Sequence, residues 1–102
     1  MIIAADVFVY VGELSEIFSL VKERLRPGGL FAFSVETCDG SDYRLRESGR
    51  FAHSENYLQQ ITAHWILRKK MEDIDLRIDT GKFIKGSLWV VELPNTTNTE
   101  WR

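Results

Sequence analysis

Two short runs of this sequence are apolar on both faces, and an amphipathic segment separates them. The first run is Ile2–Ala5 and the second is Leu30–Val35. Such runs are typical of strands that are buried on both sides of a parallel sheet. Apolar side chains in residues 14–25 recur with the spacing of one helical face, and Pro27–Gly29 ends that helix. The order strand, helix, strand predicts a right-handed parallel crossover, and therefore an α/β fold.

The second half of the chain predicts one more helix and a closing hairpin. Ser54 is a favourable N-cap, and apolar residues between it and Trp65 share one helical face. Residues 66–79 are expected to be extended, with apolar and charged residues alternating toward the end of this segment. Residues 83–93 return as the partner strand after a turn at Thr80–Lys82. We therefore predict a four-stranded mixed sheet in chain order 1-2-4-3, with the helices on one face and a C-terminal antiparallel hairpin.

Size and charge limit the classes of protein that remain. A chain of 102 residues forms one domain, which we place at residues 1–94, followed by a polar tail at residues 95–102. A net charge of -2 supplies no field that would attract nucleic acid or an anionic membrane. The single cysteine excludes an internal disulfide, and Asp6 ends the apolar opening before it reaches the length of a signal or membrane segment. These features predict a cytoplasmic location.

The polar, glycine-spaced stretch Cys38–Arg50 is longer than an ordinary connection. It follows the carboxyl end of a predicted strand, where open α/β sheets bind ligands, and we expect it to be a functional loop. Cys38 with His53 and Asp39 could form a thiol nucleophile and its base, although no oxyanion device accompanies them. No metal site is predicted, because Cys38, His53 and His64 lack any short ligand spacing.

Four segments together resemble the second half of a class I, Rossmann-like S-adenosylmethionine-dependent methyltransferase, and most closely the bacterial group associated with tetratricopeptide repeats. They are Ala5–Leu14, Leu25–Gly29, Gly49–Ser54 and Gly81–Gly86. The resemblance covers nearly the whole chain and implies a partial methyltransferase fold, with strands equivalent to strands four to seven. The seven glycines of the chain form no G-x-G pattern. The glycine-rich turn and the ribose-binding acid of the family therefore have no counterpart here.

The resemblance implies S-adenosylmethionine as the cofactor, and it implies positions for the ligands, but it identifies no catalytic residue. Residual cofactor contacts would come from Asp6 and Val7, and the acceptor pocket would be lined by Tyr10, Glu36, Arg50, His53 and Tyr57. An arginine can bind a carboxylate or phosphate through two hydrogen bonds, and a histidine can move a proton near neutral pH. The structural alternatives are that Asp6 is a turn or cap residue and that the polar residues beside the second helix serve its N-terminus.

The function predicted from these observations is a truncated methyltransferase-like protein that is inactive alone and does not bind S-adenosylmethionine by itself. Two alternatives remain open. The chain could be a small binding module that docks a separate partner protein, or it could be the C-terminal part of an active methyltransferase whose N-terminal half lies outside this sequence. A half-fold leaves the edge of Ile2–Ala5 and one apolar sheet face uncovered, so we expect a homodimer through one of these surfaces.

Overall fold

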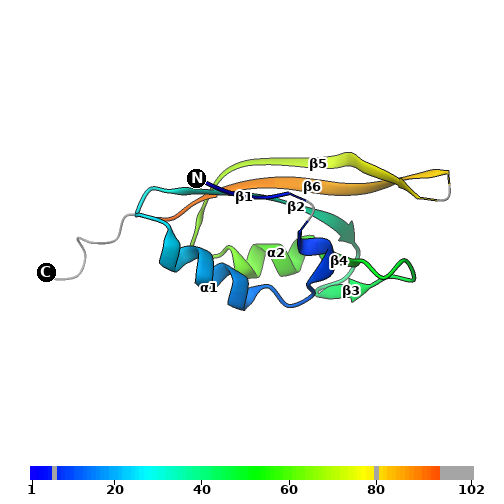
Figure 1. Ribbon diagram of the computed structural model, residues 1–102, viewed down its shortest axis with the longest axis horizontal. Coiled ribbons are helices and arrows are strands. Elements are labelled where there is room, and N and C mark those ends of the chain that lie inside the picture. Colours follow the sequence, from blue (N-terminus) through cyan, green and yellow to red (C-terminus); the bar gives the residue numbers. More distant parts are fainter. Residues whose placement is uncertain (6, 80, 95–102) are drawn as a thin grey trace, which may run out of the picture.

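A computed structural model describes residues 1–5, 7–79 and 81–94 of the chain. Three predicted features fall outside the described residues: Asp6, Thr80 in the predicted turn, and the polar tail at residues 95–102. The described residues form an α/β fold, in which a mixed sheet packs against two α-helices (Figure 1).

The first part of the chain forms the predicted parallel crossover. Strand β1 (Ile2–Ala4) pairs in parallel with strand β2 (Leu30–Cys38). A short 3-10 helix, η1 (Phe8–Tyr10), and helix α1 (Ser15–Arg24) connect the two strands. Two basic residues occupy the last turn of α1, where they favourably face the negative end of the helix dipole.

The segment predicted to be a functional loop contains regular structure. Strand β3 (Tyr43–Leu45) and strand β4 (Phe51–Ser54) form an antiparallel pair, and β4 also pairs in parallel with the last residues of β2. Helix α2 (Glu55–Ile61) follows β4 directly. The hydroxyl of Ser54 accepts a hydrogen bond from the backbone N–H of Tyr57 at 3.1 Å, which confirms the predicted N-cap.

The C-terminal hairpin consists of strand β5 (Ile66–Asp79) and strand β6 (Lys82–Glu92), and β6 also pairs antiparallel with β2. The sheet has six strands in the order β3-β4-β2-β6-β5, and β1 also pairs with β2. The predicted pairing of the first, second and hairpin strands is present, but the predicted four-stranded sheet is wrong. The prediction missed β3 and β4 because strands of three and four residues are too short to show a clear alternation.

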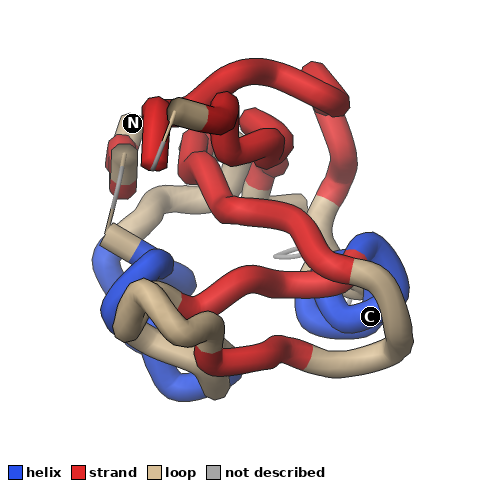
Figure 2. The backbone as a smooth tube through the Cα atoms, turned by 90° about the vertical axis from the view of Figure 1, so that its right-hand side faces the viewer, coloured by secondary structure: helices blue, strands red, loops and turns tan. Residues whose placement is uncertain are grey.

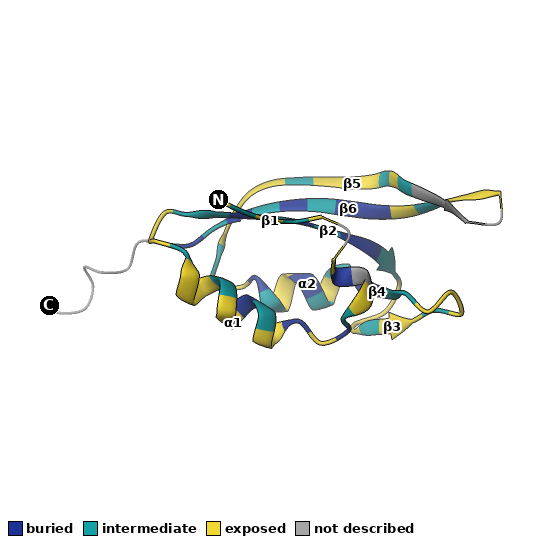
Figure 3. Ribbon diagram, in the orientation of Figure 1, coloured by how far each residue is buried: buried dark blue, intermediate teal, exposed yellow. Residues whose placement is uncertain are grey.

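Helices α1 and α2 lie on the same face of the sheet, and the core fills the space between them and the strands (Figure 1, Figure 3). The ring of Phe18 on α1 packs against the rings of Phe31 and Phe33 on β2, with centroids 5.3 Å and 5.4 Å apart. Trp89 on β6 stacks on Phe33 from the neighbouring strand and is 1% exposed. Close packing of these rings fixes the helices over the central strands.

The sheet curves, so that β3 and β4 reach the level of the helices (Figure 1). The view along the long axis shows the same curvature from the end (Figure 2). As a result, the β3–β4 pair approaches the segment around η1, which follows the carboxyl end of β1. This is the end of an α/β sheet where ligands bind.

Candidate functional site

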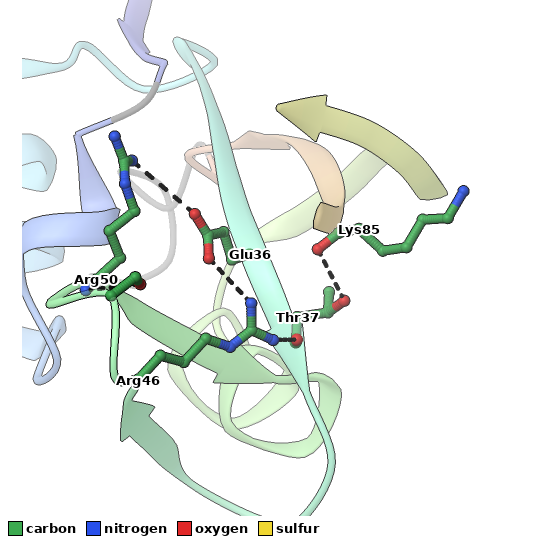
Figure 4. A network of polar contacts seen from close by, with 6 residues as sticks. Glu36, Thr37, Arg46, Arg50 and Lys85 are labelled. Carbon is green, nitrogen blue, oxygen red and sulfur yellow. Dashed lines mark hydrogen bonds and ion pairs between the residues drawn. The ribbon is translucent and has the colours of Figure 1, made fainter. Parts of the chain in front are cut away.

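A buried carboxylate lies at the carboxyl end of β2, and two arginines contact it (Figure 4). Glu36 is 1% exposed. Its Oε1 atom accepts a hydrogen bond from Nη1 of Arg46 at 3.0 Å, and Nη1 of Arg50 lies 3.9 Å from its Oε2 atom. Nη2 of Arg46 also donates to the backbone carbonyl of Thr37 on β2. Arg46 therefore links the β3–β4 hairpin to β2 through the side chain of Glu36 and the backbone carbonyl of Thr37.

Arg50 joins this carboxylate to the segment after β1. Its guanidinium lies over the ring of Tyr10, 5.6 Å from the ring centroid, at a distance suited to a cation–π contact. Tyr10 is the last residue of η1, and its side chain is 66% exposed. The ring and the guanidinium therefore form a partly open surface at the ligand end of the sheet. Such a surface can bind a flat or anionic group, because it combines an aromatic face with N–H donors.

Strand register explains why these particular side chains meet. Glu36 pairs with Ala52 on β4, and Ala52 pairs with Arg44 on β3, so these three residues share one face of the sheet. Arg50 precedes Ala52 by two residues, and Arg46 follows Arg44 by two residues. Alternation along an extended chain therefore places all the arginines of this hairpin on the face where Glu36 lies.

The opposite face of the same strands carries a second group of polar rings. His53 on β4 lies between Thr37 and Tyr43 in the strand register and is fully buried. Its ring stacks on Tyr57 of α2, with centroids 5.8 Å apart. The Nε2 atom of His53 lies 2.9 Å from the carbonyl oxygen of Val11 and 3.0 Å from that of Gly12. Since carbonyls only accept, Nε2 carries the proton and donates to them.

The protonation of His53 follows from this geometry. Its Nδ1 atom is buried and has no hydrogen-bond partner among the described residues. Burial lowers the pKa of His53 from its usual value, and the two carbonyls only partly oppose this effect. The imidazole is therefore neutral near pH 7, and its contacts anchor the backbone between η1 and α1.

The segment after η1 depends on close packing against these rings. A Cβ atom at Gly12 would lie 2.4 Å from a ring carbon of Tyr43 and 2.8 Å from one of Phe51, so only glycine fits there. The hydroxyl of Tyr57 accepts a hydrogen bond from the backbone N–H of Leu14 at 2.7 Å. Burial of this hydroxyl raises the pKa of Tyr57. These contacts hold the start of α1 against α2 and β4.

The structure thus divides the predicted acceptor-pocket residues between two faces of the sheet. Tyr10, Glu36 and Arg50 come together, whereas His53 and Tyr57 form the ring group on the helix-covered face. Of the two predicted cofactor contacts, Val7 is 47% exposed just before η1, and Asp6 lies outside the described residues.

Sequence reasoning missed Arg46, although a signal for it is present. In the segment Tyr43-Arg44-Leu45-Arg46, apolar and basic residues alternate, which indicates a short strand with both arginines on one face.

Cys38 does not form the nucleophilic pair that was considered for it. Cys38 pairs with Ser54 in the strand register, one position beyond the pairing of Thr37 with His53, so the thiol and the imidazole point to opposite faces. Burial raises the pKa of the Cys38 thiol, which keeps it protonated and a poor nucleophile. Within the described part of the chain no group of three or more potential ligands could hold a metal ion. None of the helices described is long and apolar enough to cross a bilayer.

The described residues fit only part of what S-adenosylmethionine requires. In Rossmann-like sheets the cofactor binds on a glycine-rich turn between a strand and the helix after it. Here the first glycine after β1 is Gly12, and the rings of Tyr43 and Phe51 already fill the space beside its Cα atom. The residues described therefore do not fit the nucleoside end of the cofactor.

Comparisons with known proteins support the fold. No protein-family model and no curated protein sequence matches the chain. Three solved structures are similar to the chain, and two of them are methyltransferases. An S-adenosylmethionine-dependent methyltransferase from Methanosarcina mazei has a TM-score of 0.68 at 15% identity, and TehB from Haemophilus influenzae has 0.65 at 21%. A 1,6-didemethyltoxoflavin-N1-methyltransferase from Burkholderia thailandensis, solved with 1,6-didemethyltoxoflavin and S-adenosylhomocysteine, has 0.55 at 18%.

These likenesses cover most of this chain but only part of the other proteins. They include 90%, 89% and 91% of this chain, against 57%, 34% and 44% of the respective proteins. The chain therefore spans about half or less of the length of these proteins. The comparisons show that it has the fold of class I S-adenosylmethionine-dependent methyltransferases over the part that it covers.

Proposed function

We propose that this chain supplies the methyl-acceptor side of an S-adenosylmethionine-dependent methyltransferase-like site and does not methylate by itself. One observation carries the proposal. Tyr10, Glu36 and Arg50 converge at the carboxyl ends of β1 and β2, where this fold binds ligands, while the described residues form no cradle for a nucleoside. Methylation would then need the missing cofactor contacts from another segment or another chain.

The roles of the three residues follow from their contacts. Glu36 holds Arg46 and Arg50 in place, so that the guanidinium of Arg50 keeps a fixed position over Tyr10. Arg50 and Tyr10 orient the acceptor through charge and ring contact, and neither is a catalytic base. Asp6 and Val7 supply residual contacts to the methionine end of the cofactor. The fold of the similar methyltransferases supports these assignments.

The subgroup and the cellular location of the protein are proposed from the sequence. The four segments that resemble methyltransferases favour the bacterial group associated with tetratricopeptide repeats. The protein acts in the cytoplasm, and its single cysteine, which can form no internal disulfide, fits a reducing compartment.

A titration with S-adenosylhomocysteine, followed by NMR of the backbone amides, tests where the cofactor contacts lie. We expect weak, fast-exchange shifts at Val7 and at the neighbouring residues of η1 and β2, because among the described residues these strand ends correspond to the ligand end of the fold. The variant Lys82→Ala, at the far end of the hairpin, is the control and should give the same shifts. Shifts centred on the β5–β6 hairpin, or none at the strand ends, would contradict the proposal.

A further inference from the structure

A polar cup lies beside the Glu36 network, at the end of β2. Its volume is about 260 Å³. The residues that line it are Thr37, Cys38, Asp39, Arg44 and Arg46. The volume is several times the roughly 30 Å³ that one water molecule occupies in the liquid, so the cup has room for a small polyatomic ion.

One of the two arginines in the cup is already held in place. Arg46 uses one N–H of Nη1 for Glu36 and one N–H of Nη2 for the carbonyl of Thr37. A guanidinium has five N–H donors, so three of them remain. The side chain of Arg46 is 30% exposed and can still reach a ligand from solvent. Its position costs little to organise when a ligand binds, because Glu36 and β2 already fix it.

The second arginine, Arg44, lines the same cup. Arg44 shares the strand face of Arg46 and is exposed, and no ion pair holds it in the part of the chain that the structure describes. Burial raises the pKa of the Cys38 thiol, the positive charges of Arg44 and Arg46 oppose this effect, and the negative charges of Asp39 and Asp42 add to it, so charges of both signs lie near the cup. Asp39 is the one acidic side chain in its lining.

We propose that Arg44 and Arg46 bind an oxyanion, a phosphate or carboxylate group, in this cup. Two guanidinium groups on one strand face can donate several charge-assisted hydrogen bonds to such a group. Asp39 limits the affinity through its negative charge. The site needs no cofactor and stands independently of the proposed function. If the proposed function also holds, the oxyanion is part of the methyl acceptor.

The test is an NMR titration of the 102-residue chain with inorganic phosphate, and in parallel with acetate, at constant ionic strength. We expect saturable shifts at the amides of Thr37–Asp39 and at the Nε–H of Arg44 with at least one of the two anions. The anion that binds more tightly identifies the group that the cup recognises. Neither titration contains a cofactor. An absence of anion binding would therefore contradict this proposal without contradicting the proposed function.

Single substitutions test whether the side chains that line the cup bind the anion. Arg44→Gln should weaken binding by about tenfold, since it removes a charge-assisted contact, while Asp39→Asn should strengthen it severalfold. Arg68→Gln, an exposed arginine on β5, is the matched control and should bind like the original chain. Arg46 is not substituted, because Glu36 would lose a hydrogen-bond partner. Equal affinity in the Arg44→Gln variant, no saturable shifts with either anion, or shifts that are as large at Arg68 would overturn the proposal.

Discussion

Glu36 is buried and forms ion pairs with two arginines. The exposure of those arginines determines how much the pairs stabilise the fold. Arg46 and Arg50 retain 30% and 24% side-chain exposure, so water weakens both pairs. A buried carboxylate also loses hydration free energy, which the pairs only partly offset. We therefore assign the network a role in orientation rather than in net stability. It fixes two guanidinium groups from the β3–β4 hairpin at the end of β2.

Because His53 is buried, we expect the free energy of unfolding to depend on pH. Burial lowers its pKa in the folded chain, whereas the unfolded chain titrates near the usual value of about 6.5. The unfolded state therefore binds more protons below about pH 6.5. The contribution of neutral His53 to the free energy of unfolding is complete above this pH and is lost as the pH falls toward the lowered pKa, by at most about 1.4 kcal/mol per pH unit.

Urea unfolding between about pH 5.5 and 7.5 measures this slope. In the variant His53→Gln the side-chain amide can still donate to the carbonyls of Val11 and Gly12 but does not titrate, so the slope should flatten. His64→Gln, at an exposed histidine, should keep the slope of the original chain. An unchanged slope in His53→Gln would show that this imidazole is not the group responsible.

At the scale of elements, the sequence predicted those parts whose periodicity extends over several residues. The crossover from β1 through α1 to β2, the Ser54 cap and the β5–β6 hairpin are all present. The β3–β4 hairpin was expected to be an irregular loop. Its strands are short, and what holds them in the sheet is pairing with β2 and the contacts of Arg46, which are distant in sequence.

Because strands β3 and β4 were not predicted, the site was predicted only in part. The family resemblance groups Tyr10, Glu36, Arg50, His53 and Tyr57 around one pocket, where loops are expected to converge at the ligand end of the sheet. The resemblance does not show that residues 51–54 form a strand. Once Phe51–Ser54 is known to be a strand, alternation assigns Arg50 and His53 to opposite faces.

The edges of the sheet differ in how they resist pairing with another chain. Strand β5 forms one edge, and its pairing with β6 shifts register at three places. One shift includes Asp73, which has a φ of 54° in the left-handed region. Bulges and charged residues of this kind discourage edge-to-edge association. Strand β1 carries the 68% exposed Ile3 and has neither a bulge nor a charged residue, so this edge lacks these two kinds of protection.

At the scale of the whole molecule, one face of the sheet has no helices over it (Figure 1). Ile3, Ala32 and Val90 form a row across β1, β2 and β6, on the face opposite the core rings of Phe31 and Phe33. Met71 on β5 belongs to the same face and is 43% exposed. The homodimer predicted from the sequence remains a prediction, and this face or the adjoining β1 edge is where we expect a second copy to bind.

Sedimentation velocity from about 1 to 100 μM checks the dimer, since an interface that is useful in solution should form in this range. Burial of apolar area at roughly 25 cal/mol/Å² drives the association. Ile3→Lys should shift the chain to monomer, because it places a charge in the interface. Leu20→Lys, at an exposed position on α1, is the control and should leave the dimer intact. A monomer at all concentrations, without binding of a dye for apolar surface, would refute the dimer.

The affinity of the isolated chain for S-adenosylmethionine tests the central claim most directly. The claim is that the chain carries the acceptor side of the site and lacks the contacts that fix the nucleoside. Isothermal titration calorimetry should therefore detect no binding with a dissociation constant tighter than about 10 μM, which corresponds to roughly 7 kcal/mol. A constant of about 10 μM or below, with one cofactor per chain, would show that these residues form a complete cofactor site and would contradict the account.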